Sequence, residues 1–154
     1  MTVWIFQVNP KWFNIDEYLR TRKKIFWEIN QTYLIGDISI GDTVFIWRAD
    51  GGNPKSGGIV GKGTIISLPK EMEDDAPELW IEGPPETPKQ CVQIELSEVR
   101  LKENEGMLKR GLLKNLNDLK DMYILRFYQR TNYKLEPHQA ERIQQMWEER
   151  RISL

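Results

Sequence analysis

The stretch over residues 39–68 constrains the fold most, because two strand-like runs flank a glycine-rich loop within it. Apolar residues occupy both faces of the first run, residues 43–47, so both faces of that strand must be covered. The second run, residues 59–66, contains Gly61 and Gly63, which are typical of a bulge or a bend in a strongly curved sheet. This pattern predicts a central β-hairpin, and its long loop is either a mobile tip or a lid.

Two further runs are predicted to be strands, and a third is ambiguous. Residues 3–8 are apolar on both faces and end at Asn9-Pro10, as expected of a central strand. Residues 90–99 alternate apolar and polar side chains, which is typical of a strand with one solvated face. Residues 122–128 fit either a strand or a helix, and their aromatic side chains favour a strand.

Helices are predicted in three places. Asn14 and Glu17 resemble a capping box, so a short helix is expected from Ile15 to about Lys23. Leucines at helical spacing predict one or two short helices over residues 107–119. Pro137 opens a last amphipathic helix. The chain is therefore expected to form one α+β domain over residues 1–154.

The inventory of reactive side chains is small. Cys91 is the only cysteine, so an intrachain disulfide and a cysteine-rich zinc site are excluded. His138 is the only histidine, and it is expected at the surface in the first turn of the last helix. These two residues do not make a Ser-His-Asp or Cys-His system, and no phosphate-loop or metal-ligand spacing occurs. We therefore expect no catalytic residue, no metal and no cofactor.

Charge is segregated along the chain although the formal net charge is only −1. Residues 71–98 carry nine acidic side chains and one basic one, whereas the segments on either side are basic. A local basic face is the footprint that matters for nucleic acid, so the acidic total does not exclude such a partner. The acidic, proline-rich residues 69–88 are expected to form a solvated loop. No apolar run approaches a membrane span and no signal peptide is recognisable, so we expect a cytoplasmic protein without a membrane partner.

Basic residues cluster after the first predicted helix and around the central hairpin. The first cluster either complements the C-terminal end of the helix dipole or contacts phosphates. The expected phosphate-binding residues are Arg20, Arg22, Lys23, Lys24, Arg48, Lys55 and Lys62.

Six tryptophans are many for a domain of this size. Core packing explains Trp4 and Trp147, which lie in a predicted strand and a predicted helix. The others lie at strand ends or in loops, where a flat aromatic surface is able to stack on a planar base: Trp12, Trp27, Trp47 and Trp80. Alternatively, Trp27 plugs one end of the fold and Trp80 packs back on the body of the protein.

Five stretches carry a resemblance to a known family. They are VWIFQVNP at the start, IFWEI after the first helix, IGDTVFIW, GGIVGKGTI, and the late TNYKLEPHQAERI. In this order they resemble the EVE domain, a relative of YTH domains in the PUA-like superfamily, over nearly the whole chain. The resemblance implies a PUA-like, strongly curved mixed β-barrel of about five to six strands flanked by short helices. It also implies a pocket for a modified nucleobase.

The resemblance assigns roles to individual residues. In this family and its YTH relatives a tryptophan after the first helix forms one wall of an aromatic cage, and Trp27 matches it. Asn9 matches an asparagine near the pocket mouth, and Trp47 and Trp80 are the candidates for a second cage aromatic. Glu28 stands where YTH readers have a small polar residue, which implies a different recognition of the base edge. The expected nucleobase-binding residues are Trp27, Asn9, Trp47, Trp80, Trp12, Glu28 and Ile29.

These observations favour a non-catalytic module that binds a methylated or hydroxymethylated base of DNA or RNA after the base has left its stack. The alternative is an RNA-binding or specificity domain of a larger restriction or RNA-processing machine, associated with or fused to a nuclease or NTPase, that ignores modification. A third hypothesis is an enzyme acting on a nucleotide or a small molecule, and a polar cluster of Glu28, Asp42 and His138 in space would favour it.

Overall fold

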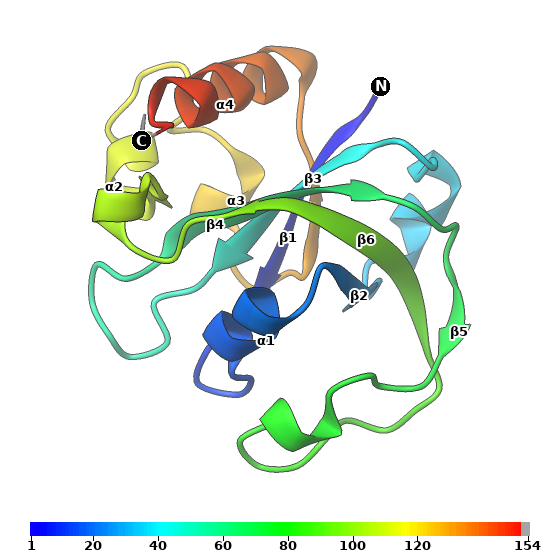
Figure 1. The fold of residues 1–154 in the computed structure, drawn as a ribbon. Coiled ribbons are helices and arrows are strands. Elements are labelled where there is room, and N and C mark those ends of the chain that lie inside the picture. Colours follow the sequence, from blue (N-terminus) through cyan, green and yellow to red (C-terminus); the bar gives the residue numbers. More distant parts are fainter. Residues whose placement is uncertain (152–154) are drawn as a thin grey trace.

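The protein, described over residues 1–151 by a computed structural model, is built on one strongly curled mixed sheet flanked by short helices (Figure 1). The strands are β1 (Val3–Val8), β2 (Lys24–Glu28), β3 (Thr43–Arg48), β4 (Gly58–Ile65), β5 (Lys70–Met72), β6 (Lys89–Val99), β7 (Leu108–Lys109) and β8 (Asn132–Lys134). The α-helices are α1 (Ile15–Thr21), α2 (Arg110–Lys114), α3 (Tyr123–Arg126) and α4 (Pro137–Glu149), and short 3₁₀ turns cover Thr32–Asp37, Pro77–Leu79 and Glu103–Glu105.

The main path of the sheet holds six strands in the order β2-β6-β4-β3-β1-β8, with β5 added to β6 and β7 added to β4. Strand β1 runs parallel to β3, and the other pairs are antiparallel. The predicted hairpin is confirmed as β3 and β4, with a register shift at Ile46/Trp47. A second register shift, at Lys62/Gly63, lies in the pairing of β4 with β6. A Cβ on Gly63 would lie 2.6 Å from the side chain of Ile94, so the close approach of β4 and β6 requires a glycine there.

Side-chain amides connect β2 and β8, the two ends of the strand order. The buried Asn132 accepts a hydrogen bond from the Asn30 amide at 2.8 Å and donates one to the Glu28 carbonyl at 3.0 Å. Gln31 accepts from the backbone amides of Thr131 and Asn132 at 3.0 and 2.8 Å. These bonds use backbone groups that a strand edge would otherwise leave unpaired, so they hold the curled sheet together beside the site described below.

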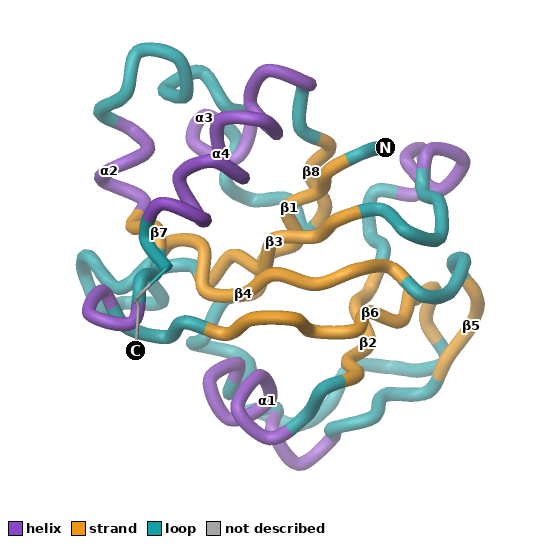
Figure 2. Tube along the Cα trace, turned by 45° about the horizontal axis from the view of Figure 1, so that its top comes forward, coloured by secondary structure: helices purple, strands orange, loops and turns teal. Residues whose placement is uncertain are grey.

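Two apolar clusters cover the two faces of the sheet, as the double-faced pattern of residues 43–47 predicts. The α1-side cluster includes Val44 and Ile46 from β3, and the α4-side cluster includes Phe45 and Trp47. Helix α1 covers the first cluster, while α2, α3 and α4 lie together over the second (Figure 2). Both clusters contain tryptophans, but different elements close them off.

Three local expectations need correction or refinement. Residues 122–128 contain the short helix α3 rather than a strand, because the backbone amides of Leu125 and Phe127 donate to the carbonyls of Met122 and Tyr123 within the segment. Met122 and Ile124 are buried in the α4-side cluster. Residues 107–119 contain one α-helix, α2, which follows β7 directly. The acidic segment over residues 69–88 is not simply a solvated loop, because it includes β5 and a 3₁₀ turn and half-buries Asp74 and Asp75.

Candidate functional site

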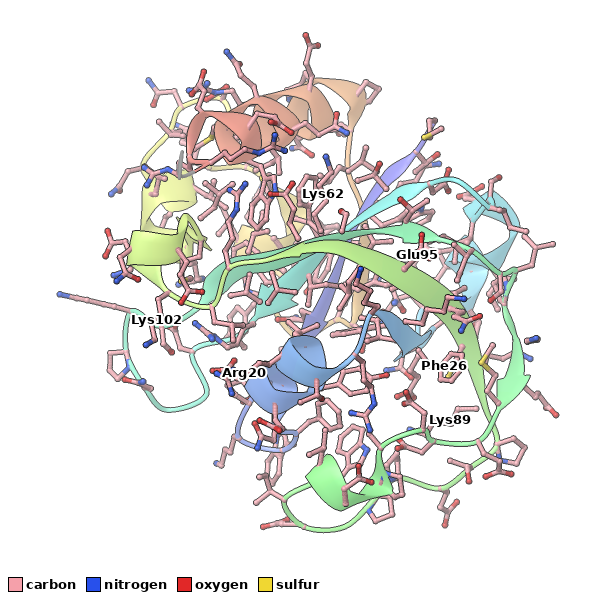
Figure 3. The ribbon with its side chains drawn as sticks, in the orientation of Figure 1. Arg20, Phe26, Lys62, Lys89, Glu95 and Lys102 are labelled. Atoms are coloured by element: carbon pink, nitrogen blue, oxygen red, sulfur yellow. The ribbon has the colours of Figure 1, made fainter. Side chains whose placement is uncertain are left out.

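A pocket of about 500 Å³ opens at one end of the α1-side cluster, where β1, β2 and the start of β6 meet the segment over residues 72–87. Figure 3 shows two of its lining residues, Phe26 and Lys89, close together on this side of the molecule. Aromatic side chains form much of the wall: Trp12, Phe13, Tyr18, Phe26, Trp27, Trp80 and Tyr128. The pocket is therefore a mainly aromatic hollow open to solvent.

Trp27 is a nearly buried part of the aromatic wall, because only 6% of it is exposed. Its strand, β2, pairs antiparallel with β6, which sets Trp27 opposite Val92. Within residues 1–151 no other aromatic ring pairs with the ring of Trp27. The residue thus belongs to the core and to the pocket at once, which combines the two roles that the sequence left open.

Trp12 and Trp80 approach the same pocket from loops. Trp12 is 45% exposed and follows a tight turn in which the Asn9 side chain accepts from the Lys11 amide at 2.9 Å. Trp80 donates its indole N–H to Asp74 at 2.9 Å, and its ring lies 4.6 Å from that of Phe13. The structure therefore brings Asn9, Trp12 and Trp80 to one pocket with Trp27.

One side of the pocket is acidic. The Tyr18 hydroxyl donates to the Asp75 carboxylate at 2.9 Å and accepts from the Phe26 amide at 2.8 Å. Burial raises the pKa of Asp75 above its usual range, and burial is also the main cause that raises the pKa of Tyr18. Glu73, whose carboxylate accepts from the Thr87 hydroxyl, lines the same side. Asp74 and Asp75 are half-buried and have therefore lost part of their hydration, whereas Glu73 is exposed.

Glu28 and Cys91 lie on the opposite strands of the β2–β6 pair, directly across from each other. The Glu28 carboxylate forms an ion pair with Lys89 at 2.9 Å. Burial, with a further contribution from the charge of Glu28, raises the pKa of the Cys91 thiol to about 11. The thiol is therefore protonated at neutral pH and offers no activated nucleophile.

Two residues predicted to bind the base do not reach the pocket. Trp47 is 2% exposed and lies in the α4-side cluster, because the strand alternation turns it to the opposite face of the sheet from Ile46. Ile29 is 3% exposed and packs within the α1-side cluster without lining the pocket.

None of the seven predicted phosphate-binding residues lines the pocket itself. Arg48 is a structural residue, since it is 7% exposed and pairs with Asp16 at 2.7 Å. Lys62 lies over the Phe45 ring at 5.8 Å. Lys24 is exposed at the start of β2.

The remaining four lie at two other hollows. Arg20, Arg22 and Lys23 line a groove of about 570 Å³ together with Lys102. Figure 3 shows Arg20 and Lys102 on the other side of the view from Phe26 and Lys89. Lys55 lines a third hollow of about 460 Å³ near α2. The groove at the end of α1 thus carries four basic side chains against the two acids Glu98 and Glu105, and none of these six residues lines the aromatic pocket.

Several lining residues were missed by sequence reasoning. Phe13 and Tyr18 were not among the predicted site residues, and the acidic pair Asp74 and Asp75 lies in the segment that was expected to be a solvated loop. The segment over residues 128–131 also lines the pocket, although it is more than 100 positions from Trp27 in the chain. The one usable signal was Trp80, a large apolar residue in an acidic loop, which must pack on something.

The polar cluster that would favour the enzyme hypothesis is not formed. Glu28 lines the pocket and His138 is exposed on α4. Asp42 is buried, where it accepts from the indole N–H of Trp4 at 3.0 Å. Among residues 1–151 no group of three His, Cys, Asp or Glu side chains is placed to hold a metal ion.

No helix within residues 1–151 is long and apolar enough to cross a bilayer.

Solved structures with similar folds include proteins bound to modified nucleic acid. The human THYN1 protein in complex with 5-methylcytosine-containing DNA matches with a TM-score of 0.68 and 13% identity, over 96% of this chain and 98% of that chain. A hypothetical protein from Leishmania major matches with a TM-score of 0.67 and 20% identity, over 97% and 96% of the two chains.

The YTH domain of the Zygosaccharomyces rouxii MRB1 protein, in complex with N6-methyladenosine RNA, has a TM-score of 0.54 and 11% identity, over 94% and 86% of the two chains. At these identities the likeness shows the fold. No protein with a curated description matches the sequence significantly. The sequence profile of the EVE domain matches residues 2–146, nearly the whole chain. The chain therefore belongs to the EVE domain family.

Proposed function

We propose that this chain is a non-catalytic nucleic-acid-binding module that takes a modified, unstacked base into the aromatic pocket. The observation that carries the proposal is the convergence of Trp12, Trp27 and Trp80 on one solvent-open hollow. Its volume, about 500 Å³, falls within the range of roughly 300–1,000 Å³ that is usual for small-molecule sites. Two proteins of similar fold, described above, are bound to nucleic acid that carries a methylated base.

Stacking supplies the binding energy in this proposal. A base that has left its stack gains about 1–3 kcal/mol from an aromatic platform. A methyl or hydroxymethyl group adds apolar area against the aromatic walls, at about 25 cal/mol per Å² of buried surface. Asn9 and Glu28 line the pocket with hydrogen-bonding groups and are the proposed readers of the base edge.

Phosphate contacts come from outside the pocket in this proposal. Arg20, Arg22 and Lys23 line one groove, and Lys24 is exposed next to them in the chain, at the end where α1 leads into β2. Arg22 also stacks on the ring of Tyr18 at 4.9 Å, and Tyr18 lines the aromatic pocket. This contact connects the basic groove with the base site, so a strand with its base in the pocket passes close to these cations.

Titration of fluorescent single-stranded oligonucleotides tests the proposal. Strands with one central 5-methylcytosine, 5-hydroxymethylcytosine or 6-methyladenine are compared with the unmodified strands, and at least one modified strand is expected to bind about tenfold tighter. Trp27→Ala should abolish this difference, whereas Trp27→Phe, the matched control that keeps an aromatic wall, should retain part of it. Equal affinity for plain and modified strands would overturn the proposal and favour RNA binding that ignores modification.

A further inference from the structure

The lining of the aromatic pocket carries more negative than positive charge. Its ionisable lining includes four carboxylates, Glu28, Glu73, Asp74 and Asp75, against the two cations Lys89 and Arg130. A pocket that holds part of a polyanion would be expected to show the reverse balance. The charge of the lining therefore constrains the charge of the group that enters the pocket.

Both cations of the lining are already engaged. Lys89 forms an ion pair with Glu28 at 2.9 Å. The guanidinium of Arg130 lies over the ring of Tyr123 at 5.0 Å and donates a hydrogen bond to the hydroxyl of Tyr33. Within residues 1–151, neither Lys89 nor Arg130 therefore forms an ion pair with the other three carboxylates of the lining.

The remaining carboxylates have neutral partners. Asp74 accepts from the Trp80 indole at 2.9 Å, Asp75 from the Tyr18 hydroxyl at 2.9 Å, and Glu73 from the Thr87 hydroxyl. Within residues 1–151 no ion pair includes any of these three acids. Each carboxylate has two oxygens and about four acceptor sites, so lone pairs remain for a ligand.

Arg22 is the cation whose charge acts on Asp75, but it is engaged elsewhere. It stacks on Tyr18 at 4.9 Å and pairs with Glu78 at 3.3 Å. Burial still raises the pKa of Asp75 although Arg22 and Tyr18 act in the opposite direction. Asp74 and Asp75 are thus half-buried, and within residues 1–151 neither of them forms an ion pair.

Aromatic faces next to such carboxylates complement a flat ring that carries positive charge. The ring quadrupole of tryptophan attracts a cationic ring, and the carboxylates accept hydrogen bonds from the exocyclic amino group of such a base. Resting on the proposed function, we propose that the pocket prefers a base that alkylation at a ring nitrogen has made cationic, such as 1-methyladenine or 3-methylcytosine. The neutral isomers 6-methyladenine and 5-methylcytosine are then secondary ligands.

Isomer pairs isolate the charge from the size of the base. Each pair carries the same single methyl group on the same parent base, so apolar area and stacking surface are nearly equal. The amino group of adenine or cytosine would donate to a carboxylate in either isomer, so a hydrogen bond alone predicts a small difference. The cationic base also lowers the negative charge of the strand, which weakens its attraction to the basic groove. A preference for the cationic isomer therefore reports on the pocket.

The test is an anisotropy titration at pH 7 and 0.15 M salt, with single strands that contain one of the four modified bases. The cationic isomer of each pair is expected to bind about tenfold tighter. Asp75→Asn keeps an oxygen for the Tyr18 hydroxyl, and Glu73→Gln keeps one for Thr87, so both variants are expected to fold and to lose most of that preference. Glu71→Gln is the matched control, since Glu71 is exposed on β5 and lies outside the pocket lining.

The outcomes separate the two proposals. If the neutral isomers bind as tightly as the cationic ones while both exceed the plain strand, the charge preference is overturned and modified-base binding stands. If the preference persists in both Asp75→Asn and Glu73→Gln, the carboxylates do not cause it and the inference is overturned as well. If no modified strand exceeds the plain one, both proposals fail. Thermal melting of each variant shows whether it is folded, so that a loss of the preference for the cationic base is not mistaken for a loss of folding.

Discussion

Both apolar clusters of this fold contain buried tryptophans, but among residues 1–151 the aromatic pocket lies at the α1-side cluster. In the α4-side cluster Trp147 is fully buried, with Arg100 stacked on its ring at 3.9 Å. In the α1-side cluster Trp4 is equally buried, but Trp27 forms the wall of a pocket. The residue type is the same in each place, so the covering element decides what a tryptophan does.

The covering elements differ in length and character. Helix α4 has 13 residues and presents Ala140, Ile143, Met146 and Trp147 to the sheet. Helix α1 has seven residues, and the strand ends beyond it are bordered by the acidic segment over residues 72–87. A short helix beside a loop leaves part of the apolar face uncovered, and in this fold that part is the pocket.

Removing a tryptophan from the closed cluster should produce the largest effect. Trp47→Ala is expected to lower the free energy of unfolding by about 3–5 kcal/mol, because it deletes a fully packed aromatic side chain. Urea denaturation followed by circular dichroism measures this change. A loss below about 1 kcal/mol would contradict the assignment of Trp47 to the closed core.

The thiol of Cys91 offers a chemical probe of the open cluster. Its pKa is raised from 9.0 to about 11, so at pH 8 the thiolate population should be about 100-fold lower than for an ordinary cysteine. Iodoacetamide labelling of the folded protein is therefore expected to be about 100-fold slower than labelling in urea, and to accelerate as the pH rises toward 11. A bound modified strand should slow it further, because Cys91 lines the pocket. Equal labelling rates for the folded and the unfolded chain would contradict the buried environment and the raised pKa of Cys91.

Trp12 should separate binding from stability. Because it is 45% exposed, Trp12→Ala is expected to change the unfolding free energy by less than about 1 kcal/mol. Loss of one stacking wall should weaken binding of the preferred modified strand about tenfold. The same two assays used for Trp47 and for the oligonucleotides report both quantities. A stability loss as large as that of Trp47→Ala would place Trp12 in the core instead.

The smallest expected effect is a gain in stability. Burial raises the pKa of the Asp75 carboxyl in the folded state. The protonated carboxyl therefore contributes stability below pH 3.8, the pKa of the unfolded chain, and this stability is lost as the pH rises through the pKa of the folded state. At pH 7 the neutral Asp75→Asn should therefore raise the melting temperature, by up to about 2 °C. Calorimetry at pH 7 and pH 3 checks the sign, and a lower melting temperature at pH 7 would show that the carboxylate stabilises the fold.

The sequence predicted the sheet better than the site, and the reasons are physical. Strands β1, β3, β4 and β6 carry their pattern locally, as alternation bounded by turn residues, so they are readable along the chain. Helix α3 was misjudged because its aromatic side chains favour a strand locally, whereas Met122 and Ile124 are buried in the α4-side cluster with residues distant in the chain.

The site depends on contacts that no local pattern encodes. Asp75 is held in the pocket by a hydrogen bond from Tyr18, 57 positions away in the chain. The hydrogen bonds of Asn132 likewise join segments about 100 positions apart. Trp27 and Asn9 were found because the family resemblance supplies the spatial information that the spacing lacks. Trp47 was included for the same aromatic character, although its face of the strand points to the other cluster.

The indole N–H resonances of the six tryptophans test the central claim most directly. In an ¹H–¹⁵N titration with an oligonucleotide carrying the preferred modified base, the signals of Trp12, Trp27 and Trp80 should shift, while those of Trp4, Trp47 and Trp147 should stay in place. Unmoved signals from the first three, or shifts confined to the last three, would contradict the proposal that the base binds in the hollow beside Trp27.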